Sequence, residues 1–166
     1  ELFVKGTNGN ILEVATGEET VELSRESSIK ILGQTVPGAT TSSTVIVPAT
    51  FRYHIDINGE WNLVQEENRL FVIAPGLAPS LPVAFDSEKM QKINPSGWSR
   101  YFAGGNMEEL VKTITPELKN RAIDKENMKR FEADAKQAIA KFVKTWLVGK
   151  ELWDIGKIDE IYIYFP

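Results

Sequence analysis

The clearest alternation of apolar and polar positions in the chain lies between Thr44 and Ile57. Every odd-numbered position from Val45 onward is apolar or aromatic, whereas most of the polar side chains stand at even positions. A period of two over fourteen residues predicts a long strand with one buried face. Pro48 cannot donate a hydrogen bond to a neighbouring strand, so we expect a sheet edge or a bulge there.

Shorter apolar runs on both sides of this segment predict further strands, at 2–5, 11–15, 20–24, 29–32, 69–74 and 83–85. Asn58-Gly59 is a favoured pair for a two-residue turn, and it predicts a hairpin from the long strand into Glu60–Gln65. The small, polar segment Gly38–Ser43 predicts a loop. Asp86 predicts the N-cap of a brief helix through Lys92. The strands together predict a β-meander.

The second part of the chain carries helical spacing instead. A helix is expected to start at Asn106, and Thr115-Pro116 either kinks this helix or starts another. The strongest helical pattern follows Asp124, a good capping residue, and its apolar positions recur every three or four residues for over five turns. Residues 159–165 alternate again, which predicts a final strand that returns to the sheet.

These elements predict an α+β fold, in which a mostly antiparallel β-meander sheet packs on a long C-terminal amphipathic helix and a C-terminal strand closes the fold. Residues 1–166 are expected to form a single domain, mainly β over 1–106 and mainly α over 107–166 apart from the final strand. We expect Phe131, Phe142 and Trp146 to pack against the odd-numbered face of the long strand.

Composition removes several kinds of chemistry. The chain has no cysteine and one histidine, which excludes disulfides, thiolate metal sites, cysteine nucleophiles and multi-histidine metal sites. Its net charge of −4 argues against a generally basic nucleic-acid binder. No apolar run approaches the ~20 residues of a membrane span. We therefore expect no metal, no cofactor and no nucleic-acid partner.

Arg52, His54 and Asp56 point the same way from the long strand, at intervals of about 6.5–7 Å. One interpretation is a histidine–carboxylate pair that serves as a general base, with Arg52 holding an anion. The other is an ordinary solvated face of the sheet. We favour the second, because no G-x-S-x-G motif accompanies these residues, and we assign no catalytic residue.

Aromatic residues and a cation gather between Trp98 and Phe102, within the segment Asn94–Gly105 that predicts irregular structure. Trp98, Arg100 and Tyr101 are candidates for a binding pocket, since loops on a rigid scaffold carry much function. The alternative, which we favour, is that the aromatic side chains anchor the loop to the core.

Five segments in a fixed order resemble a bacterial family of unknown function: Val45–Ile57, Val72-Ile73-Ala74-Pro75, Leu81-Pro82-Val83, Thr115-Pro116-Glu117-Leu118 and Ala135–Leu147. The resemblance covers residues 10–165, and its motifs are structural, so it implies no catalytic residues. Members of that family typically sit outside the cytoplasm behind one N-terminal membrane anchor. The resemblance implies the same location here, with an apolar segment before Glu1.

We therefore expect a non-enzymatic, extracytoplasmic, membrane-tethered module that binds or assembles with an unidentified protein partner or with itself. Two alternatives stay open. One is a small enzyme or ligand-binding protein that uses Arg52, His54 and Asp56. The other is a homo-oligomeric scaffold. A cleft that holds His54 would favour the enzyme, and a large exposed apolar patch would favour assembly.

Overall fold

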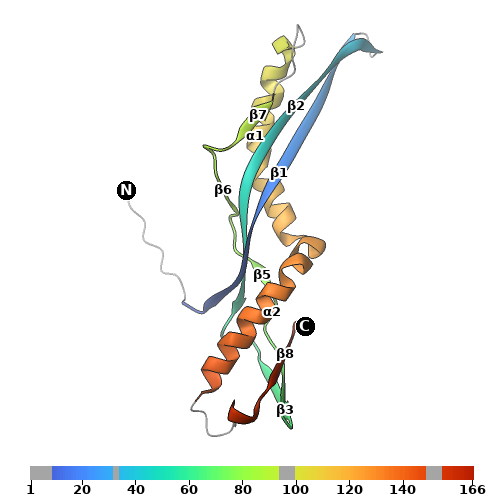
Figure 1. Cartoon of the computed structure of the whole chain (residues 1–166). Coiled ribbons are helices and arrows are strands. Elements are labelled where there is room, and N and C mark those ends of the chain that lie inside the picture. The colour runs from blue at the N-terminus through green and yellow to red at the C-terminus, as the bar shows by residue number, and fades with distance from the viewer. Residues whose placement is uncertain (1–8, 32–33, 94–99, 149–154) are drawn as a thin grey trace. The chain divides into compact units, whose positions relative to one another are not determined.

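The computed structural model describes residues 9–31, 34–93, 100–148 and 155–166 (Figure 1). It confirms the α+β class. The chain forms two compact units, one of residues 1–17, 52–80 and 123–166 and the other of residues 18–51 and 81–122. The single domain over residues 1–166 stays a prediction. It requires the two units to unfold together in one cooperative transition.

The first sheet is built on two long strands, β1 (Ile11–Ile31) and β2 (Gln34–Asp56). Three short strands pair antiparallel with β2: β5 (Ala78–Pro79), β6 (Ala84–Phe85) and β7 (Gln91–Ile93). The odd positions of β2 from Val45 to Ile55 are buried, as the alternation predicts, while Ile57 is half-buried.

Both long strands extend further than the sequence predicts. Gly38–Ser43 belongs to β2, so the predicted loop is wrong, and the candidate strands from residue 11 to residue 31 join into β1. Pairing between strands supplies backbone hydrogen bonds whatever the side chains are, so small polar residues can continue a strand. The candidate strand at 2–5 lies outside the described residues.

The predicted helix from Asp86 to Lys92 is also wrong. The carboxylate of Asp86 accepts hydrogen bonds from the backbone N–H groups of Glu88 (3.0 Å) and Lys89 (3.2 Å). This pattern closes a turn, and the chain then enters β7 instead of a helix.

A second sheet holds β3 (Asn62–Glu66), β4 (Arg69–Ile73) and β8 (Glu160–Tyr164), with β4 in the centre. β3 runs antiparallel to β4 and β8 runs parallel to it, so the final strand does not return to the sheet of β2. The predicted hairpin at Asn58-Gly59 is wrong as well. The N–H of Gly59 donates to the carbonyl of Asp56 (3.0 Å) in a turn that ends β2, and β3 pairs with β4.

Two long helices follow. α1 (Arg100–Ile123) begins six residues before the predicted start at Asn106 and continues through Pro116. It is joined to β1 by the ion pairs Arg25–Glu109 (2.6 Å) and Arg121–Glu19 (3.3 Å). α2 (Lys125–Leu147) begins as predicted, because the Asp124 carboxylate accepts a hydrogen bond from the N–H of Asn127 (3.0 Å). A short 3-10 helix, η1 (Ile155–Lys157), precedes β8.

α2 buries a narrow stripe of small and aliphatic side chains, Ala135, Ile139, Val143 and Leu147, and it packs beside β8. Phe131 meets Tyr53 of β2 as expected, with ring centroids 4.7 Å apart. The expectation is wrong for Trp146, which is 43% exposed, whereas Phe142 is half-buried. The ring centroids of both residues lie about 6 Å from that of Trp61. Trp61 comes two residues after Gly59, and the turn at Gly59 places the Trp61 side chain beside α2.

Candidate functional site

The predicted polar face of β2 carries three of the candidate residues. Arg52 and Asp56 are exposed and His54 is half-buried, so all three lie on the face opposite the buried odd positions. They belong to the first compact unit.

His54 finds its partner outside its own strand. Its ring nitrogen Nδ1 lies 2.8 Å from the hydroxyl oxygen of Ser80, which follows β5. In the antiparallel register His54 is paired with Ala78, and Ser80, two residues further along that chain segment, therefore lies close to the His54 ring. The backbone N–H of Ser80 also donates to the carbonyl of Arg52 (2.8 Å). The proline-containing segment after β4 is thus fixed to β2 at Arg52 and at His54.

Asp56 has a different task. Its carboxylate oxygen Oδ1 accepts a hydrogen bond from the backbone N–H of Asn58 (3.0 Å), which is the geometry of an Asx-turn. The histidine–carboxylate pair considered from the sequence is therefore replaced by a histidine–serine contact and a turn-forming aspartate.

The second predicted group is described in part. Arg100 and Tyr101 lie in the first turn of α1, where the sequence predicts irregular structure, and Trp98 lies outside the described residues. Arg100 and Tyr101 belong to the second compact unit.

The outward face of the β3–β4–β8 sheet is a cluster of exposed and half-buried apolar side chains, none of which is a candidate site residue from the sequence. Its members are Val64, Phe71, Ile73, Tyr162 and Tyr164, and we call it the outer apolar face. Strand pairing sets Val64, Phe71 and Tyr162 in one row across the three strands, and Ile73 beside Tyr164 in the next. The rings of Phe71 and Tyr162 are stacked, with their centroids 5.4 Å apart. Four of the five side chains are 39–49% exposed.

A charged row borders this face. Strand pairing places Arg69 between Glu66 and Glu160. The hydroxyl of Tyr162 donates a hydrogen bond to the Glu160 carboxylate (2.7 Å). This bond, followed by the nearby negative charge, raises the pKa of the Tyr162 phenol above its ordinary value. The row carries two carboxylates and one guanidinium, so its net charge is negative.

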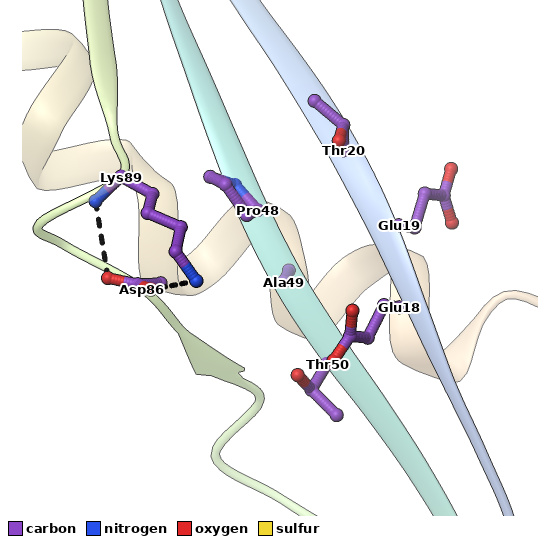
Figure 2. A pocket seen from close by; sticks show the side chains of 8 residues that line it. All are labelled: Glu18, Glu19, Thr20, Pro48, Ala49, Thr50, Asp86 and Lys89. Atoms are coloured by element: carbon purple, nitrogen blue, oxygen red, sulfur yellow. Dashed lines mark hydrogen bonds and ion pairs between the residues drawn. The ribbon is translucent and has the colours of Figure 1, made fainter.

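A pocket of about 410 Å³ lies in the second compact unit between β1, β2 and the turn after β6 (Figure 2). Its lining includes Glu18, Glu19, Asp86 and Lys89. Glu19 pairs with Arg121, and Lys89 lies 3.1 Å from the Asp86 carboxylate. The hydrogen bonds from Lys89 lower the pKa of Asp86. Among the described residues, no group of three or more histidine and carboxylate side chains is arranged to hold a metal ion.

No protein-family model, no curated protein and no solved structure matches this chain. No helix in the described part of the chain has the length and apolar character needed to cross a membrane.

Proposed function

We propose that this protein is a non-catalytic binding or assembly module and that it binds its partner through the outer apolar face of the β3–β4–β8 sheet. The observation that carries the proposal is that this sheet presents five neighbouring apolar side chains, four of them exposed and Phe71 half-buried, on the face opposite its buried residues. Exposed apolar clusters of this kind mark interaction surfaces, since leaving them in water costs free energy.

The chemistry of the face supports the same role. Aromatic residues, tyrosine above all, are enriched where proteins bind one another, because they combine a large apolar area with a polar tip. Tyr162 and Tyr164 alternate along β8 with the half-buried Ile161 and the buried Ile163, so both rings point outward. The charged row that includes Arg69 supplies a polar border to one side of the cluster.

Photo-cross-linking in living cells tests this proposal. A photoreactive phenylalanine at position 162 should form light-dependent adducts with one partner, identified by mass spectrometry. The matched control carries the same group in place of Lys119, an exposed residue of α1. The substitution Ile73→Asp should remove the adducts at position 162. Equal labelling at both positions would contradict the proposal.

The proposed location is outside the cytoplasm, behind a membrane tether. This part rests on the family resemblance of the sequence motifs. Protease added to intact spheroplasts should digest the natural full-length protein, while a cytoplasmic control protein stays intact. Protection of the protein until the spheroplasts are lysed would overturn this part.

One contact favours a second candidate, a small hydrolytic enzyme. His54 Nδ1 lies 2.8 Å from Ser80 Oγ, which is the distance between a general base and its nucleophile. Against it, the N–H of Ser80 is engaged by the carbonyl of Arg52 and so does not serve as an oxyanion donor. A fluorophosphonate probe should leave Ser80 unlabelled. Labelling that disappears in both Ser80→Ala and His54→Gln would establish the enzyme instead.

A further inference from the structure

A groove of about 400 Å³ opens beside the outer apolar face. Its walls are mostly apolar and include Ile73, Pro75, Gly76 and Pro166, with Asn62 and the acidic residue Glu60 on the β3 side. Gly59 packs tightly here, because a Cβ at this position would lie 2.8 Å from the Cβ of Pro75. Two proline rings and a closely packed glycine give the groove stiff walls.

The groove and the face are continuous. Ile73 belongs to both, and it is paired with Asn62 of β3 and Tyr164 of β8. Along β4, the order is therefore Arg69 in the charged row, Phe71 in the aromatic row and Ile73 at the groove. Alternate residues of a strand are about 6.5–7 Å apart, so the charged row and the groove are separated by about 13 Å.

This spacing matches an extended peptide. Four residues of an extended chain span about 13 Å, and every second side chain points to the same side. A peptide that lies along β4 would present three side chains to the surface: one to the charged row, one to Phe71 and Tyr162, and one to the groove. The net negative charge of Glu66, Arg69 and Glu160 favours a basic residue at the first position.

We infer that the outer apolar face binds a short extended peptide segment with a basic residue, an apolar residue two positions along and a second apolar residue four positions along. This inference rests on the proposed function and names its partner. A second copy of the chain fits less well. The face offers five apolar side chains, whereas a stable protein–protein interface uses roughly 20–30 residues a side.

Three capped peptides test the inference: Lys-Thr-Val-Thr-Leu, a charge-reversed form with Glu first, and a form with Gly last. Each is titrated into ¹⁵N-labelled protein and followed by NMR. The first peptide should shift the amide signals of Phe71, Ile73 and Tyr164. It should bind at least fivefold more tightly than either of the other two.

Variants of the protein locate the two ends of the peptide. Gly76→Leu places a side chain beside Pro166 in the groove and should weaken the leucine peptide at least fivefold, with no effect on the glycine form. Gly9→Leu is the matched control, because nothing lies within 4 Å of a Cβ at Gly9. Glu66→Lys should reverse the preference between the lysine and glutamate peptides.

The outcomes separate this inference from the proposed function. If position 162 cross-links in cells but the three peptides bind equally or not at all, the peptide pattern is wrong and the binding face stands. If the adduct at position 162 is a second copy of the chain, the inference fails and the face serves self-assembly. If neither experiment gives a signal, both proposals fall.

Discussion

The two faces of the β3–β4–β8 sheet differ in what covers them, and much less in how apolar they are. The inward positions of β4, Leu70 and Val72, are fully buried, whereas the outward positions Phe71 and Ile73 are half-buried and exposed. All four residues are strongly apolar and occupy one five-residue strand. Burial therefore depends on whether another element packs on a face, as α2 does beside β8. Among the described residues, no element covers the outer apolar face to the same degree, and four of its five side chains stay exposed.

Removing an inward side chain should have the largest effect. Leu70→Ala should lower the free energy of unfolding by about 2–5 kcal/mol, because it leaves a cavity at a fully buried position. Chemical denaturation followed by circular dichroism measures this change. A loss as small as that for an exposed residue would show that the inward face is not the packed one.

The approach of β1 to α2 is a second point at which packing can be broken. A Cβ at Gly17 would lie 2.6 Å from Cε1 of Phe131, a ring that Tyr53 already restrains. Gly17→Ala should therefore destabilise the protein by about 1–3 kcal/mol through overpacking. The same substitution should cost clearly less in a Phe131→Leu background, and equal costs in both backgrounds would refute the contact.

A substitution on the outer apolar face should affect binding and leave stability nearly unchanged, in contrast to the substitution on the inward face. Ile73→Thr keeps a β-branched residue at an exposed position, so the free energy of unfolding should change by less than about 0.5 kcal/mol. The same variant should weaken binding of the leucine peptide. A large destabilisation would mean that the outer face supports the fold, and its role in binding would then need a different variant.

The smallest expected effect is a change in the pKa of the Tyr162 phenol on the outer apolar face. Glu160 holds the pKa of Tyr162 above its ordinary value of about 10, so Glu160→Gln should lower that pKa. The protonated phenol is the favoured form in the folded protein. Its contribution to stability is complete below the unfolded pKa and is lost as the pH rises through the raised folded pKa. Site-specific ¹³C NMR of Tyr162 follows the titration, and an unchanged midpoint in the variant would exclude the contact with Glu160.

The sequence predicts the fold best where local patterns are long. The alternation from Val45 to Ile55 identifies the buried face of β2, and Asp124 with the helical spacing after it identifies α2. The prediction from sequence fails for Gly38–Ser43. The small polar residues of this segment are typical of a loop, but in the structure they continue the strand β2. The prediction also fails at the start of α1, where glycines and missing periodicity hide a helix.

The candidate site was harder to predict, because it depends on contacts between distant parts of the chain. The exposure of Arg52 and Asp56 follows from alternation, but the partner of His54 is 26 residues away. Alternation in residues 159–165 separates Tyr162 and Tyr164 from the inward positions of β8, Ile161 and Ile163. Only the register with β4 shows that these tyrosines join Phe71 and Ile73 in one surface.

The parallel pairing of β4 with β8 has a consequence for synthesis of the protein. Asn68, just before β4, and Asp159, just before β8, are hydrogen-bonded across a separation of 91 residues. A ribosome adds about 5–20 residues per second, so β4 waits on the order of 5–20 seconds for this neighbour. During that interval its central position is an open edge, able to pair with strands of other nascent chains. Chaperone dependence should therefore be greatest for chains stalled just before β8.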